Sequence, residues 1–313
     1  MAIISVSRRT DIPAFYTDWF LSRLGQDVVV PNPYNRGQAI RIPLTKDTVD
    51  CFVFWTKDPR PLLDRIGELG GYNYYFQYTL NGYGNDVERN VPPVDVSIRT
   101  FRELSGTIGR KKVIWRYDPI LINDRASVDW HISNFGNIAD ALHEHTDRCV
   151  ISFVDMYQRF GDSPPFRAPT EQEIGRIAEG LSSISKEYGL SLSTCCESVD
   201  LGRYGIRHGS CIDRLLILEL FGIDIGGRKD GQRKDCGCSR CHDIGVYGTC
   251  THGCVYCYAA SSLTASSGRP LMNVIGSPVM TGMLDSGIDV HPIGPERRCR
   301  IRQLSEYDRD VRP

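Results

Sequence analysis

The sequence lacks long hydrophobic runs, a strong excess of charge and a leader-like N-terminus. No stretch approaches the roughly 18 uninterrupted apolar residues of a membrane-spanning helix. The first basic residues, Arg8 and Arg9, come after the short apolar start rather than before it, unlike those of a secretory signal. The 37 basic and 38 acidic residues leave a net charge of −1, which gives no general attraction for nucleic acid or anionic lipid. We therefore expect a cytoplasmic protein that binds neither membranes nor nucleic acid.

Cysteine, in contrast, is abundant, with twelve residues in a chain of 313. Cys51 and Cys149 lie in apolar, strand-like runs, and we expect them to be small core residues. Nine of the other ten cysteines fall between Cys195 and Cys257. In a cytoplasmic protein, such clustering favours metal binding over disulfide bonds.

Residues 1–225 repeat one pattern, in which an apolar run is followed by a polar loop and an amphipathic stretch. The expected strands are Ile3–Ser7, Asp50–Trp55, Tyr74–Thr79, Val113–Tyr117, Cys149–Val154 and Leu190–Cys195. The expected helices are Tyr16–Leu24, Pro61–Leu69, Val96–Ile108, Val128–His143 and Thr170–Tyr188. Apolar strands that alternate with helices imply a parallel sheet covered by helices. We predict an α/β fold, a partial or complete (β/α) TIM-like barrel, with an inserted hairpin formed by Val28–Val30 and Ala39–Ile42.

Polar side chains follow most of the expected strands. In chain order they are Arg8, Arg9, Asp11, Lys57, Asp58, Gln77, Thr79, Arg116, Asp118, Asp155 and Glu197. In a parallel barrel these C-terminal strand ends meet at one mouth, where the active site is built. Arg116 and Asp118 share one strand face, so burial requires that they pair with each other or contact a ligand.

The composition changes after residue 225. Residues 226–235 form a polar, glycine-containing linker, and residues 236–258 are rich in Cys, Gly and aromatic residues without clear periodicity. We therefore expect two parts: a barrel domain over residues 1–225, and a Cys-rich iron–sulfur segment with a C-terminal tail over residues 226–313.

The central motif is the CX3CX2C spacing of Cys250, Cys254 and Cys257. Three thiolates can hold three irons of a [4Fe–4S] cluster and leave the fourth iron open. Gly253 supplies a position that can adopt a positive φ, as a tight ligand loop requires. His252 could replace a thiolate, but we expect it to form a local hydrogen bond in the loop.

The remaining cysteines allow two interpretations. A second, fully ligated cluster would take four thiolates from Cys195, Cys211, Cys236 and Cys238. Alternatively, the CX2C pairs Cys238–Cys241 and Cys254–Cys257 match a zinc ribbon. The zinc pattern leaves Cys236 and Cys250 unused, so the spacing favours the iron–sulfur interpretation.

The motif resembles the cluster motif of the radical SAM superfamily, with aromatic Tyr256 just before the third cysteine. The whole chain resembles more closely DUF1848, a family of uncharacterised bacterial proteins described as having a C-terminal cysteine cluster like that of radical SAM enzymes. This resemblance is carried by Ser5–Pro13, Val53–Lys57, Trp115–Pro119 and Cys236–Tyr258. It implies a bound cluster and indicates no substrate.

Two features differ from typical radical SAM enzymes. The superfamily usually places this motif after its first barrel strand, whereas here it follows the last one. The chain also has no Gly-Gly-Glu motif of the kind that contacts the amino group of S-adenosylmethionine (SAM). A cluster on a C-terminal segment reaches a substrate only if the segment folds back, so we expect it to cap the barrel mouth.

The resemblance implies an enzyme in which SAM binds the open iron and yields a 5′-deoxyadenosyl radical that acts on an unknown substrate, with electrons from a donor such as flavodoxin or ferredoxin. The expected cofactor-binding residues are Arg8, Arg9, Lys57 and Tyr256. The expected catalytic residues are Arg116, Asp118, Asp155 and Glu197. The alternatives are a zinc-stabilised barrel acting as a binding module and a two-cluster electron-transfer protein.

Overall fold

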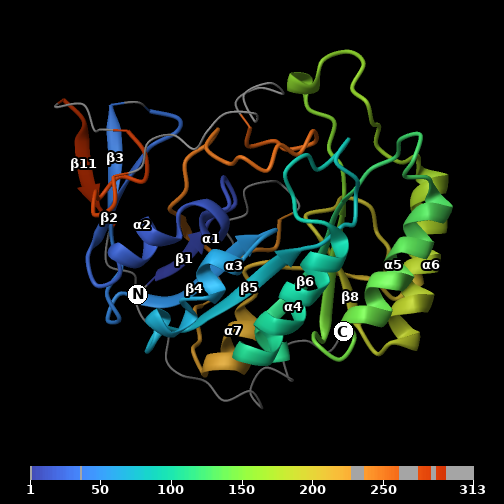
Figure 1. The fold of residues 1–313 in the computed structure, drawn as a ribbon, viewed down its shortest axis with the longest axis horizontal. Helices are drawn as coiled ribbons and strands as arrows, with labels where there is room; N and C mark the ends of the chain where they lie inside the picture. The colour runs from blue at the N-terminus through green and yellow to red at the C-terminus, as the bar shows by residue number, and fades with distance from the viewer. Residues whose placement is uncertain (1, 36, 227–235, 261–273, 283–286, 294–313) are drawn as a thin grey trace.

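The computed structural model describes residues 2–35, 37–226, 236–260, 274–282 and 287–293. Its main feature is an eight-stranded sheet in the order β10-β1-β4-β5-β6-β7-β8-β9, in which every neighbouring pair is parallel (Figure 1). The strands are β1 (Ala2–Val6), β4 (Val49–Thr56), β5 (Tyr74–Thr79), β6 (Val113–Ile120), β7 (Arg148–Phe153), β8 (Ser191–Cys195), β9 (Arg207–Gly209) and β10 (His242–Asp243). Within the described residues no pairing joins β10 to β9, so a closed barrel is not formed there.

The predicted hairpin is present and belongs to a second, three-stranded sheet. Its strands β2 (Asp27–Pro31) and β3 (Gln38–Pro43) pair antiparallel. A third strand, β11 (Asp289–Pro292), pairs parallel with β3. The hairpin is therefore extended by a strand from the far end of the chain.

Helices connect the strands of the main sheet. They are α1 (Ile12–Phe15), α2 (Thr17–Ser22), α3 (Arg60–Leu63), α4 (Val94–Ile108), α5 (Val128–Leu142), α6 (Glu171–Glu187) and α7 (Arg214–Phe221), with short 3-10 turns at Ile66–Leu69, Arg110–Lys112, Gln158–Phe160 and Gly202–Tyr204. Helix α6 begins with a capping box, in which the Thr170 hydroxyl accepts from the Glu173 N–H and the Glu173 carboxylate accepts from the Thr170 N–H. No helix among the described residues is long and apolar enough to cross a membrane.

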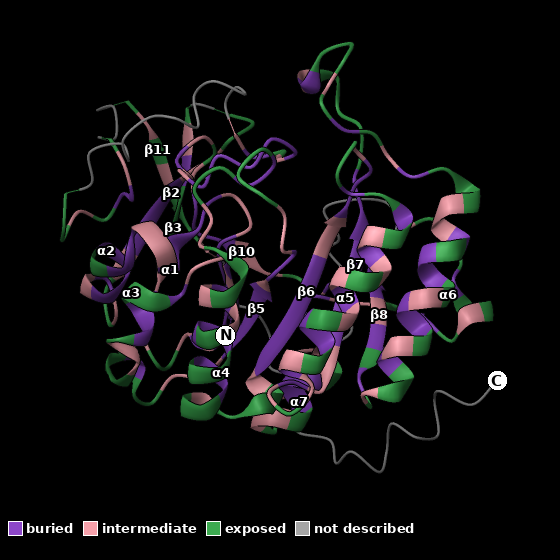
Figure 2. Ribbon diagram, turned by 45° about the vertical axis from the view of Figure 1, so that its right-hand side comes forward, coloured by how far each residue is buried: buried purple, intermediate pink, exposed green. Residues whose placement is uncertain are grey.

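The two faces of the main sheet are covered differently. Successive side chains of a strand point to opposite faces, and in β4 Phe52 and Phe54 enter the large core under helices α1–α6. Cys51 and Val53 enter a second cluster that also contains residues of α7 and several of the cysteines. Figure 2 shows the strands buried between these layers. Strands buried on both faces explain why their sequences are apolar throughout.

All six strands predicted for the main sheet are present, and two short strands of that sheet were not predicted; nor was β11 of the second sheet. Strand β9 has three residues and β10 has two, which is too short for a recognisable apolar pattern. Strand β10 matters most for the organisation of the chain, because the segment after residue 225 adds it to the edge of the main sheet beside β1.

Candidate functional site

A cavity of about 520 Å³ opens at the C-terminal ends of the parallel strands. Ser7–Asp11, which follow β1, line one side, and Trp55–Lys57 at the end of β4 lie beside them. Arg116 and Asp118 of β6, Ser152–Asp155 at the end of β7 and Cys195 at the end of β8 complete this part of the wall. Parallel strands bring these separated segments to one edge of the sheet, as their polar ends predicted.

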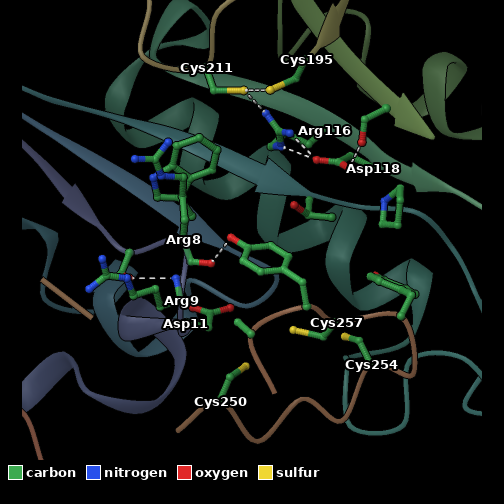
Figure 3. A pocket seen from close by; sticks show the side chains of 18 of the residues that line it. Arg8, Arg9, Asp11, Arg116, Asp118, Cys195, Cys211, Cys250, Cys254 and Cys257 are labelled. Atoms are coloured by element: carbon green, nitrogen blue, oxygen red, sulfur yellow. Dashed lines mark hydrogen bonds and ion pairs between the residues drawn. The ribbon is translucent and has the colours of Figure 1, made fainter. Parts of the chain in front are cut away.

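Cys250, Cys254 and Cys257 line the same cavity, and Figure 3 shows their sulfur atoms turned toward a common space. Their loop is tied to the loop after β5, because the Val255 N–H donates to the Val87 carbonyl (3.0 Å) and Cys254 forms an isolated bridge with Glu88. The loop thus lies over the C-terminal strand ends.

Two residues inside the loop fix its course. Gly253 has a φ of +70°, the left-handed conformation that the spacing predicted. A Cβ atom there would lie 3.2 Å from the Cβ atom of Arg89. His252 is buried, and its Nε2 lies 2.7 Å from Oδ2 of Asp11, 241 residues away. The prediction that His252 hydrogen-bonds locally was therefore wrong, because its partner belongs to the β1 end of the sheet.

A buried polar network anchors Tyr256 beneath the cysteine loop. The Glu88 carboxylate accepts from Lys57 Nζ (2.7 Å), from Asn81 Nδ2 (3.0 Å) and from the Tyr256 hydroxyl. The Lys57 ammonium also lies 5.7 Å from the centre of the Tyr256 ring. Lys57 lines the cavity as predicted, but its charge is directed at Glu88 and at the base of the loop.

Two thiols of this loop, those of Cys250 and Cys254, are held in their neutral form by burial. Burial raises the pKa of Cys250 to about 12, and the nearby Cys257 adds to the shift. Burial also raises the pKa of Cys254 well above its usual value, although the Lys57 cation opposes the shift. Cysteines with raised pKa values are poor nucleophiles at neutral pH, whereas binding to a metal would deprotonate them. The loop therefore suits metal ligation better than nucleophilic catalysis.

Four further cysteines group on another part of the cavity wall. They are Cys195, Cys211, Cys236 and Cys238. Cys211 Sγ lies 2.6 Å from Cys195 Sγ, and Cys238 is within hydrogen-bonding reach of Cys195, Cys211 and Cys236. Arg116 Nη1 donates to Cys211 Sγ (2.6 Å), and its guanidinium also binds Asp118. Figure 3 shows Cys195 and Cys211 across the cavity from the Cys250–Cys257 loop.

The two pairs of the zinc-ribbon pattern do not come together. Cys238 and Cys241 belong to the cluster against α7, whereas Cys254 and Cys257 pack with residues around Tyr83 and Phe160. Among the residues that the structure describes, no three or more Cys, His, Asp or Glu side chains already surround the position of a single metal ion.

The predicted cofactor-binding arginines both line the cavity. Arg8 Nη2 donates to Cys241 Sγ (3.0 Å), and its guanidinium lies 5.7 Å from the centre of the Trp55 ring. Arg9 Nη1 donates to the Gly245 carbonyl (3.2 Å). The Nε atoms of both are buried without a hydrogen-bond partner, although each lies within 3.9 Å of an Asp243 carboxylate oxygen.

The predicted catalytic residues are placed unequally. Asp118 lines the cavity and accepts from Arg116 and from the Ser152 hydroxyl. Asp155 is an exposed cavity residue beside Tyr157. Glu197 is not among the lining residues, and its Oε1 accepts from the Phe153 N–H (2.9 Å). Gln77 is also set back, and its Nε2 donates to the Cys211 carbonyl (2.9 Å).

Sequence reasoning did not identify three residues that shape the site. Glu88 lies in an irregular loop with no motif to mark it. Trp55 was placed on a strand, but its position between Arg8 and Arg116 depends on the order of the strands in the sheet. Asp243 accepts from Ser5, Ser7 and the Arg8 N–H, and it lies in the two-residue strand β10. The one sequence signal for Asp243 was its place shortly after the CX2C pair Cys238–Cys241. An Asp near a pair of cysteines is too common to predict a functional role.

The family described as "Domain of unknown function (DUF1848)" matches residues 3–259 of the chain. No curated protein matches it. Among solved structures, the crystal structure of a candidate alpha-L-fucosidase from Bacteroides thetaiotaomicron VPI-5482 is similar over 50% of this chain and 67% of that one, with 14% identity and a TM-score of 0.27. A similarity this weak carries no argument about fold or function.

Proposed function

The chain belongs to the DUF1848 family, and from the geometry of its cavity we propose that it is a radical-SAM-type iron–sulfur enzyme. Cys250, Cys254 and Cys257 would hold a [4Fe–4S] cluster with one open iron, and the adjoining cavity would take SAM and the substrate. The observation that carries this proposal is the shared cavity, because a CX3CX2C loop from the C-terminal segment faces the same space as the polar strand ends.

The chemistry of the donor set fits such a cluster. All three side chains are thiols from one tight loop, and thiolates are the preferred ligands of iron–sulfur clusters. The loop is held by hydrogen bonds to the sheet and by the buried network around Glu88. The backbone that carries the three ligands is therefore fixed in position. The Lys57 cation near Cys254 would offset part of the negative charge of bound thiolates.

When bound, a cluster of this kind supplies an electron that breaks the S–C5′ bond of SAM and gives methionine and a 5′-deoxyadenosyl radical. The residues of this chain would position the reactants and keep water out. Arg8 and Arg9 are two cations of the cavity wall that would contact the carboxylate of SAM or an anionic group of the substrate. Asp155 is an exposed carboxylate of the described cavity wall that would bind a hydroxyl or amine.

Two earlier candidates for direct substrate contact take other roles in this proposal. The Arg116 guanidinium is engaged by Cys211 and Asp118, so we assign it to positioning rather than to an anion of the substrate. Glu197 holds the end of β7 through the Phe153 N–H. The electron donor would be a one-electron protein such as flavodoxin or ferredoxin, which implies a cytoplasmic location.

The other two functions are less well supported. A zinc-stabilised binding module would need Cys238, Cys241, Cys254 and Cys257 at one point, and these residues pack in two separate clusters. A simple electron carrier would have little use for a 520 Å³ cavity lined by charged side chains.

The test is anaerobic purification followed by metal and SAM analysis. We expect a brown protein with iron and sulfide, of which about four irons per chain depend on Cys250, Cys254 and Cys257. SAM should change the electron paramagnetic resonance (EPR) spectrum of the reduced cluster, and reductant should then yield 5′-deoxyadenosine. The Cys149→Ala variant controls for loss of a buried thiol outside the loop. Stoichiometric zinc in place of iron, or iron that the Cys250→Ala/Cys254→Ala/Cys257→Ala variant retains in full, would refute the proposal.

A further inference from the structure

The second group of cysteines is assembled from three separate parts of the chain. Cys195 ends β8, Cys211 follows β9, and Cys236 and Cys238 come from the segment before β10. Directly after Cys195, Cys196 has a φ of 58°. This left-handed conformation is uncommon for a residue with a side chain and is often retained at functional sites. The four cysteines therefore come together through the tertiary structure and not through a single local turn.

The position of Cys211 is fixed by side chains of β5. Its carbonyl oxygen accepts from the Tyr75 hydroxyl (2.7 Å) and from Gln77 Nε2 (2.9 Å). The neighbouring Ile212 N–H donates to Cys238 Sγ (3.5 Å), a backbone contact of the kind found at iron–sulfur sites. Both Tyr75 and Gln77 are buried, so the loop is held by groups that have no competing contact with water.

Arg116 places a buried positive charge against these sulfurs. Only 6% of its side chain is exposed, and Nη1 donates to Cys211 Sγ (2.6 Å) and to Gln77 Oε1 (3.3 Å). Its guanidinium stacks 5.2 Å from the centre of the Trp55 ring, and Asp118 binds its other edge. A guanidinium held this rigidly favours a negatively charged partner, as the ligand sulfurs of a bound cluster would be.

We propose that Cys195, Cys211, Cys236 and Cys238 hold a second iron–sulfur cluster in the cavity wall, and that Arg116 is its positioning residue. Four thiolates close the coordination of such a cluster, so this site would not bind SAM. It goes beyond the radical-SAM proposal, because its ligands and its contacts are independent of the Cys250–Cys257 loop.

A cluster fits this wall better than a single zinc ion. A four-iron cluster is larger than a single ion and needs space beside its ligands, and all four of these cysteines line a cavity. A tetrahedral zinc with bonds of about 2.3 Å needs its sulfurs about 3.8 Å apart, and a cluster needs them farther apart still. Cys195 and Cys211, now 2.6 Å apart, must therefore separate to bind either group.

The decisive protein is the full chain with Cys250, Cys254 and Cys257 replaced by Ala, reconstituted anaerobically with ferrous iron and sulfide. We expect it to retain about four irons per chain, and to lose them when Cys211→Ser is added. The reciprocal variant, Cys195→Ser/Cys211→Ser in the wild-type chain, should keep only the cluster whose EPR spectrum responds to SAM. Failure of this second site is thus distinguishable from failure of the SAM site.

A second measurement tests the role of Arg116. Removal of a positive charge beside a cluster disfavours its reduced, more negative state, so Arg116→Gln should lower the midpoint potential of the retained cluster. Arg116→Lys should restore part of the shift, and Arg99→Gln, which alters an exposed helix residue, should cause none. Circular dichroism of each variant separates iron loss from misfolding. A folded triple variant without iron, one that binds zinc instead, or one with a Cys195–Cys211 disulfide would overturn the proposal.

Discussion

The buried ion pair between Lys57 and Glu88 offers the sharpest test of how the cysteine loop is supported. Only 13% of the Lys57 side chain and 3% of the Glu88 side chain are exposed, and Nζ lies 2.7 Å from Oε1. The same carboxylate binds Tyr256 of the loop. Lys57→Met removes the charge with little change in volume and leaves Glu88 with Asn81 and Tyr256 as hydrogen-bond donors.

Loss of one partner from a buried pair costs about 3–5 kcal/mol, because the remaining charge stays buried without compensation. Since two donors to Glu88 remain, we expect Lys57→Met to lower the free energy of unfolding by about 3 kcal/mol, near the bottom of that range. The matched control is the surface pair of Arg65 and Glu68, whose side chains are 38% and 50% exposed. Arg65→Met should cost less than about 1 kcal/mol.

The measurement is urea-induced unfolding followed by circular dichroism. Lys57→Met, Glu88→Gln and the double variant form a double-mutant cycle. We expect the double variant to be more stable than the sum of the single losses implies, because it leaves no unpaired buried charge. A free energy of unfolding for Lys57→Met within about 1 kcal/mol of the wild-type value would show that the pair is solvated. The prediction that this buried pair supports the cysteine loop would then be refuted.

Three further predictions concern the scaffold. Phe135 is fully buried and stacks on Trp115 with ring centres 4.6 Å apart, so Phe135→Ala should lower the free energy of unfolding by about 3–5 kcal/mol in urea; a loss below about 1 kcal/mol would contradict this packing. Thr170→Ala should cost about 1 kcal/mol, because it removes the cap of α6, and Thr170→Ser should restore most of that loss in the same assay. Burial lowers the pKa of His131 to about 4, so between about pH 6.5 and pH 4 only the unfolded chain takes up the proton. Stability should be level above pH 6.5 and fall by roughly 3 kcal/mol toward pH 4; an unfolding series against pH in which His131→Gln shows the same fall would assign it to another group.

Much of the fold followed from local pattern. The six long strands and the helices between them are marked by apolar runs and amphipathic periodicity, and the sheet is parallel as expected. The predicted number of strands in the main sheet was too low. Strands β9 and β10 have only three and two residues, and they form by pairing with strands already in the sheet. Whether the sheet closes into a barrel could not be predicted from the sequence either, because closure depends on the geometry of edge strands that carry no apolar pattern.

The sequence by itself determined the chemistry available to the candidate site. The CX3CX2C spacing puts three thiols in one short loop, and Gly253 permits the positive φ that the loop needs. Polar residues after the strands had to meet at one edge of a parallel sheet. Each of these properties follows from a local sequence pattern, so no tertiary structure was needed to recognise it.

Only the tertiary structure decided which of those groups touch. His252 binds Asp11 across 241 positions, and Arg116 contacts Cys211 across 95. Such contacts depend on the order of the strands and on how β10 adds the C-terminal segment to the sheet beside β1. Spacing along the chain carries no information about distances of this kind. For that reason the contact of Arg116 with the Cys211 sulfur could not be predicted from the sequence.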